Sequence, residues 1–217
     1  LAGLMFGTVA LSHIIIAVFL APPILLYIFL IVKKIDKTIL YYFSIIFIGA
    51  LVSAYQWSAS IIYKSYLFIT AYPQDPLALL YSPTLSELLY APWRLGFLFQ
   101  GPKGETAYLL GYAQVLVLGI VIFLSLKEKI DKKYRHILIF CVVSILFILF
   151  LMSPYSKIIW SNFPPVNGPL SQRLLLLVSF FTSLLAGYLV VTRKKSTILI
   201  YLIIAVAIWS TILNWGQ

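Results

Sequence analysis

The chain has 217 residues, of which 62% are hydrophobic and only 10% charged, and its mean hydropathy is +1.02. A soluble domain of this size carries roughly a quarter charged residues, so the composition excludes an ordinary soluble globular protein. The net charge of +10 does not indicate nucleic acid, because eleven of the sixteen Lys and Arg residues are confined to three short segments between apolar stretches. The composition predicts an all-α, polytopic transmembrane helix bundle.

The first 32 residues are too long for one ordinary membrane helix and divide between Ser12 and His13. We expect a truncated span over about 1–11 and a full span over 14–32. A helix that begins in mid-membrane lacks partners for its backbone, so we expect the chain to be a portion of a longer protein. Gly3 and Gly7 have the GxxxG spacing that favours close helix packing.

Further spans are predicted in five stretches that contain no Asp, Glu, Lys or Arg, and these stretches are 38–63, 106–126, 136–152, 174–191 and 196–213. Each has the length needed to cross roughly 30 Å of hydrocarbon as a helix. All the spans together form one transmembrane domain over 1–217.

The short basic segments predict the orientation of the spans. If they face the cytoplasm, every helix alternates in direction as the positive-inside rule requires. We therefore expect a multi-pass plasma-membrane protein whose short basic loops are cytoplasmic and contact anionic lipid, with loops 64–105 and 153–173 outside.

The outer loop 64–105 alternates turn signals such as Asp-Pro and Gly-Pro with short apolar pieces, a pattern typical of amphipathic helices that lie in the membrane interface. Asp75 is either a turn former or an acidic group of a substrate cleft. Glu87 lies either on the solvent-facing side of an interfacial helix or in that substrate cleft. Trp93 and Arg94 either anchor the loop in the interface or border a site for sugar or phosphate.

The outer loop 153–173 ends in Arg173, directly before an apolar stretch. Its guanidinium either anchors the helix end among the headgroups or offers two parallel hydrogen bonds to a phosphate. Lys157 and Trp160 lie three residues apart and serve either as anchors or as a substrate platform. His13, at the first helix break, is either a helix-end hydrogen-bonding group or a ligand for phosphate.

The sequence contains no HExxH, no Cys/His cluster, no P-loop and no GxSxG. We therefore expect no metal site and no cofactor in this stretch of chain, and a divalent metal in the full-length protein stays open.

The stretch MSPYSKIIWSNFPPVNGPLSQRLLLLVSFFTSLLAGYL resembles a characteristic segment of a bacterial membrane family called 6-pyruvoyl-tetrahydropterin synthase-related. In that family Ser-Pro-x-Ser-Lys-x-x-Trp precedes a Gln-Phe-Pro-Trp-Arg stretch that opens a helix. The matching residues here are Ser153, Pro154, Ser156, Lys157, Trp160 and Arg173. The Phe-Pro-Trp portion is not matched, because Pro169, Leu170, Ser171 and Gln172 stand there.

A second stretch, LSELLYAPWRLGFLFQGPKGETAYLLGYAQVLVLG, is similar to the Pro-Trp-x-x-Gly loop of the same family and to the Leu-Gly helix that follows it. The residues that carry this similarity are Pro92, Trp93, Gly96, Gly101, Leu110 and Gly111. LSHIIIAV resembles the helix break with His in that family, and LNWGQ resembles its exit from the membrane.

The resemblance implies a GT-C-like fold, which belongs to membrane glycosyltransferases that use polyprenyl-phosphate-linked sugars outside the cytoplasm. It implies a catalytic acid upstream of Leu1 and a donor phosphate held by Arg173, with Lys157 and His13 nearby. Two other functions stay open, a transporter or flippase for a lipid-linked or small solute, and a non-catalytic membrane subunit. Spans without ionisable residues weigh against an ion-coupled carrier. The sugar, the acceptor and the oligomeric state are not predicted.

Overall fold

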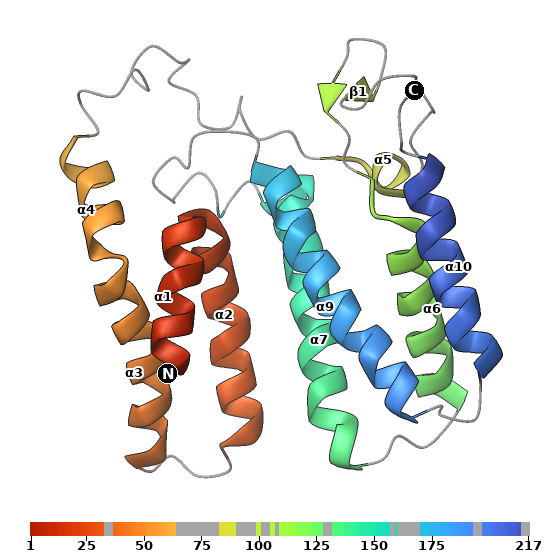
Figure 1. The fold of residues 1–217 in the computed structure, drawn as a ribbon, viewed down its shortest axis with the longest axis horizontal. Coiled ribbons are helices and arrows are strands. Elements are labelled where there is room, and N and C mark those ends of the chain that lie inside the picture. Colours follow the sequence, from red (N-terminus) through yellow and green to blue (C-terminus); the bar gives the residue numbers. More distant parts are fainter. Residues whose placement is uncertain are drawn as a thin grey trace. The chain divides into compact units, whose positions relative to one another are not determined.

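The computed structural model shows an all-α chain, as the composition predicts (Figure 1). It describes residues 1–32, 37–63, 83–89, 99–100, 105–106, 109–127, 132–156, 159, 170–192 and 197–213. Among these residues the exception to helix is a short antiparallel pair, β1 (Phe99–Gln100) and β2 (Glu105–Thr106), in which Phe99 is opposite Thr106.

The contacts divide the chain into two compact units, where the sequence predicted one domain over 1–217. Unit 1 comprises Leu1–Tyr81 and Lys157–Leu174, and unit 2 comprises Ser82–Ser156 and Leu175–Gln217. Each unit is described by itself below.

The described residues of unit 1 form α1 (Ala2–Ser12), α2 (Ile14–Ile31), α3 (Lys37–Val52) and α4 (Ala54–Ile62), together with the first residues of α9 (Leu170–Thr192). The break expected after Ser12 is present, because His13 is extended with φ −158° and ψ 94°. The continuous helix expected over 38–63 is instead two helices separated by Ser53.

Side-chain hydrogen bonds at Ser53 explain why α3 ends there. The Ser53 hydroxyl donates to the Gly49 carbonyl at 2.9 Å and to the Ala50 carbonyl at 3.3 Å. Trp57 Nε1 also donates to the Ala50 carbonyl, at 2.9 Å. The Gly49 carbonyl also accepts from the Ser53 N–H at 3.1 Å, so the hydroxyl adds to the backbone donor there, whereas at Ala50 two side chains compete with the backbone for the carbonyl. Hydropathy does not report this competition, so the sequence pattern predicted one helix.

Glycines bring α1 and α3 into close contact, with the two helices running in the same direction. A Cβ atom on Gly3 would lie 2.9 Å from Ile48 Cβ, and one on Gly7 would lie 2.8 Å from Val52 Cβ. Gly49 on α3 lies opposite Gly7, where an added Cβ would meet the Phe6 ring. The GxxxG spacing of α1 therefore forms a helix–helix contact within the chain.

Unit 2 contains α5 (Leu85–Leu89), α6 (Tyr112–Lys127), α7 (Lys132–Met152), a 3-10 turn η2 (Pro154–Ser156), most of α9 (Leu170–Thr192), and α10 (Thr197–Leu213). α6 begins six residues later than the apolar stretch predicted. The reason is a hydrogen bond from the Leu110 N–H to the Leu88 carbonyl, at 2.8 Å, which ties this part of the chain to α5. α7 extends four residues further toward the N-terminus than predicted, into its basic segment.

Aromatic contacts fix the directions of the helices in unit 2. Tyr134 and Tyr188 have ring centroids 6.0 Å apart, and Phe140 and Phe181 have theirs 5.4 Å apart, so α7 and α9 are antiparallel. The start of α6 lies beside the end of α10, because the Tyr112 and Trp209 centroids are 6.2 Å apart. The side chains buried at these helix interfaces include Val117, Val121, Leu138, Cys141, Ile145, Ile148, Leu177, Val178, Phe181, Leu185 and Leu189.

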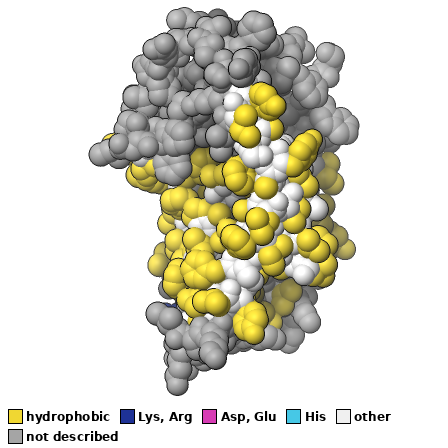
Figure 2. All heavy atoms as spheres, turned by 90° about the vertical axis from the view of Figure 1, so that its left-hand side faces the viewer, with side chains coloured by type: hydrophobic (Ala, Val, Ile, Leu, Met, Phe, Trp, Pro, Cys, Tyr) yellow, Lys and Arg dark blue, Asp and Glu magenta, His cyan; other side chains and the backbone are white. Residues whose placement is uncertain are grey.

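Among the described residues, two helices are long and apolar enough to cross a membrane, over Tyr134–Met152 and Arg173–Thr192, and 39% of an 18-residue window in each is buried inside the protein. Large apolar side chains are exposed on both units. On the face of unit 1 that carries α3 and α4, hydrophobic side chains cover much of the described surface (Figure 2). The exposed residues on these two helices include Leu40, Tyr41, Phe43, Phe47, Leu51 and Tyr55. Apolar surface of this extent is typical of membrane or interaction surfaces.

Candidate functional site

Arg173 lies in the first turn of α9, as the loop sequence predicts, and is partly buried. Within the described part of the chain, no hydrogen bond or salt bridge engages its guanidinium. Leu174 beside it is 1% exposed, so the helix is anchored next to the cation. A guanidinium on a helix anchored in this way can donate two parallel hydrogen bonds to a phosphate.

No charged side chain follows Arg173 until residue 193, where the sequence continues with Arg-Lys-Lys. The apolar part of α9 rises about 1.5 Å per residue and is therefore about 29 Å long. Arg173 and this basic segment are thus attached to opposite ends of one helix with the length of a membrane span.

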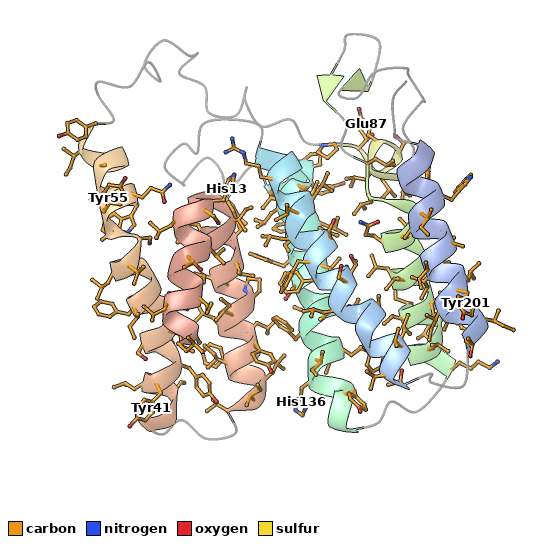
Figure 3. The ribbon with its side chains drawn as sticks, viewed as in Figure 1. His13, Tyr41, Tyr55, Glu87, His136 and Tyr201 are labelled. Atoms are coloured by element: carbon orange, nitrogen blue, oxygen red, sulfur yellow. The ribbon has the colours of Figure 1, made fainter. Side chains whose placement is uncertain are left out.

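His13 joins α1 to α2 at one end of unit 1 (Figure 3). Its backbone serves both helices, because its N–H donates to Val9 at 2.9 Å and its carbonyl accepts from Ala17 at 3.2 Å. The imidazole takes no part in capping. Nδ1 is buried and has no hydrogen-bond partner among the described residues. A nitrogen of this kind is available as a donor or acceptor for a bound group.

His13 and Arg173 belong to the same compact unit by their contacts. Two of the three residues that the sequence proposed for a phosphate are therefore described within unit 1. The third, Lys157, lies outside the described residues. The same holds for four of the five proposed cleft residues, which are Trp160, Trp93, Arg94 and Asp75.

Glu87 is engaged in a local structure that the sequence analysis did not predict. Its Oε2 accepts hydrogen bonds from the Thr84 N–H at 2.7 Å and the Thr84 hydroxyl at 2.8 Å. The Glu87 N–H returns a bond to Thr84 Oγ1 at 3.3 Å. This is a capping box, in which Thr84 and Glu87 satisfy each other's backbone donors at the start of α5. Its sequence signal, Thr-x-x-Glu, was present at 84–87.

Sequence reasoning also missed a polar contact inside unit 2. Gln114 Nε2 on α6 donates to Ser179 Oγ on α9 at 3.3 Å. Gly111 makes room for the amide, because a Cβ there would overlap the Gln114 side chain. Gln114 is the one amide within the apolar stretch 106–126, and this was the available signal. An amide that bonds across helices restricts how α6 and α9 can slide against each other.

In the described part of the chain, no group of three or more His, Cys, Asp or Glu residues could hold a metal ion.

Comparison of the chain with protein-family models, with curated proteins and with solved structures gives no match.

Proposed function

We propose that this chain is the membrane-embedded part of a GT-C-like glycosyltransferase that uses a polyprenyl-phosphate-linked sugar outside the cytoplasm. The observation that carries the proposal is the position of Arg173. This cation lies at one end of α9, about a membrane thickness from the basic segment at the other end, and its guanidinium donors are unengaged in the described structure. The family resemblance supplies the sugar donor.

Several features support the placement of unit 2 across a bilayer, with α6 and α10 crossing beside α7 and α9. The pair Tyr112 and Trp209 lies at one end of the unit, and the pair Tyr134 and Tyr188 lies toward the other. Tyr and Trp are enriched at both membrane–water interfaces. The end of α6, the start of α7, the end of α9 and the start of α10 also share one side of the unit. The sequence in and next to these helix ends, over 127–135 and 193–195, carries eight Lys or Arg residues, as the positive-inside rule requires of cytoplasmic loops.

In the proposed reaction an acceptor hydroxyl attacks the anomeric carbon of the sugar, and the bond from that carbon to the lipid-phosphate oxygen breaks. A carboxylate, which the resemblance places upstream of Leu1, takes the hydroxyl proton. Arg173 stabilises the negative charge that develops on the departing phosphate. Removing one such preoriented donor typically lowers kcat by about 10²–10³-fold. The family resemblance assigns His13 to the same phosphate, and its Nδ1 has no hydrogen-bond partner among the described residues.

A passive carrier of a lipid-linked solute is the second candidate, and one observation favours it. Unit 1 has an interrupted helix at Ser53, between α3 and α4. Helices interrupted at membrane depth commonly line a solute path. A carrier would move the lipid-linked sugar between leaflets without releasing the sugar from its phosphate.

The test is transfer of a radiolabelled sugar from a polyprenyl-phosphate donor by the full-length protein in membrane vesicles. We expect Arg173→Ala to lower transfer at least 100-fold with unchanged expression, and Arg173→Lys to restore part of it. Gly187→Ala is the matched control on the same helix, because an added Cβ there meets no atom within 4 Å. Wild-type transfer by Arg173→Ala would overturn the assignment. Movement of intact donor without transfer would favour the carrier.

A further inference from the structure

The two ends of unit 2 differ in charge. Within the unit, Glu87 and His136 lie at opposite ends (Figure 3). Residues 127–136, around the end that holds His136, include five Lys or Arg residues and two acidic residues. Residues 193–195 add three further cations. The chain from 83 to 111, which includes α5, instead balances two acidic and two basic residues.

The directions of the four long helices place the ends that adjoin basic sequence on one side of the unit. The end of α6 and the start of α7 are joined by residues 128–131, and the end of α9 and the start of α10 are joined by residues 193–196. The contact between Tyr134 and Tyr188 places the start of α7 beside the last turns of α9. Neighbouring helix ends therefore belong to two ranges of the sequence that lie about sixty residues apart. These ranges, 127–136 and 193–195, each carry a net charge of +3 and together carry +6.

The described cations at this end face outward. Lys127, the last residue of α6, is exposed, and its Nζ lies 5.6 Å from the centroid of the Phe123 ring one turn back. Arg135 and His136, near the start of α7, are also exposed. Within the described residues, no salt bridge engages Lys127 or Arg135. Exposed apolar side chains such as Leu126 and Ile137 lie beside them.

We propose that this end of unit 2 is a binding surface for anionic phospholipid headgroups. Lys127 and Arg135 contact the phosphate, and the neighbouring exposed apolar side chains contact the acyl chains. The inference rests on the membrane placement proposed above but not on the transferase activity. Lys or Arg near an anionic leaflet contributes roughly 1 kcal/mol of binding free energy each. A surface with several such cations therefore binds an anionic lipid more tightly than a zwitterionic lipid with the same acyl chains.

The experiment measures binding of phosphatidylglycerol and of phosphatidylcholine to the purified full-length protein in neutral detergent by native mass spectrometry. We expect preferential binding of phosphatidylglycerol that weakens as salt is raised. The double variant Lys127→Gln/Arg135→Gln should weaken phosphatidylglycerol binding by about 25-fold, which corresponds to two cations at about 1 kcal/mol each. Phosphatidylcholine binding should not change.

The matched control is Lys64→Gln/Lys103→Gln, which removes the same charge from the two ends of the 64–105 loop. It should leave phosphatidylglycerol binding unchanged. Equal loss in both double variants, or no preference for phosphatidylglycerol in the wild type, would overturn the proposed surface. A protein recovered without detergent in the soluble fraction would overturn the membrane placement as well. A detergent-extracted protein that does not discriminate between the lipids would overturn only this inference.

Discussion

At the scale of single residues, the sequence predicted the positions that interrupt or terminate apolar stretches. His13 was expected at a helix break and Arg173 at a helix start, and both are found there. These residues were visible because a polar group stands out in an apolar stretch. The hydrogen bond from Trp57 to Ala50 was not predictable, because it depends on a local geometry that forms only when the helix breaks. The cap that Glu87 forms with Thr84 was not predicted, because Thr84 was not considered.

The capping box makes a prediction that separates the two roles of Glu87. Glu87→Gln should keep wild-type transfer, because Gln at this position can still accept from the Thr84 N–H. Glu87→Ala should destabilise the segment around α5 by about 1 kcal/mol, since it loses the cap. Limited proteolysis of the two variants measures the second effect. Loss of transfer in Glu87→Gln with an intact segment would instead place the carboxylate in the substrate cleft.

At the scale of helices, hydropathy predicted where apolar segments lie but not where helices end. The start of α6 depends on the bond between Leu110 and Leu88, which joins residues far apart in sequence. The division into α3 and α4 depends on Ser53, which a hydropathy average hides. The spacing of Gly3 and Gly7 indicated that α1 packs closely against another helix, but a GxxxG motif does not identify that helix as α3.

The glycine contact predicts that Gly7→Ala lowers stability, because the new Cβ would lie 2.8 Å from Val52 Cβ and Cγ1. Overpacking of this kind typically costs about 1–3 kcal/mol. Thermal unfolding in detergent measures the effect. Gly119→Ala on α6 is the matched control, because its Cβ meets no atom within 4 Å, and it should unfold at or above the wild-type temperature. Adding Val52→Ala should recover part of the loss in Gly7→Ala, and no recovery would contradict the contact.

At the scale of the whole molecule, the sequence predicted the class of fold, and the number of compact units was not visible in it. Apolar stretches report burial or lipid contact one segment at a time, whereas the division into two units depends on which helices contact each other. The candidate site was predicted in part for the same reason. Arg173 and His13 were identified one by one, and only contacts assign them to one unit.

The proposed orientation predicts which positions a membrane-impermeant thiol reagent reaches on intact cells. In a Cys141→Ala background, Ser86→Cys should react from outside, whereas Thr192→Cys should react only after the membrane is opened. Ser86 and Thr192 are exposed and lie near opposite ends of unit 2. Labelling is read by the mass shift of the purified protein. Reaction of Thr192→Cys on intact cells would reverse the orientation and place Arg173 on the cytoplasmic side.

In the proposed membrane placement, the unequal lengths of the helices in unit 2 would have a consequence for the surrounding bilayer. α7 and α9 have 21 and 23 residues, and α6 and α10 have 16 and 17. At about 1.5 Å per residue, the first pair is close to or longer than a hydrocarbon layer of roughly 30 Å, and the second pair is several ångströms shorter. Such a hydrophobic mismatch is relieved by tilting the long helices and thinning the lipid beside the short ones. For a membrane-embedded chain, lipid headgroups beside α6 and α10 would lie deeper than elsewhere around the protein, and a lipid-linked molecule that diffuses along that side would have its phosphate lowered toward the membrane midplane.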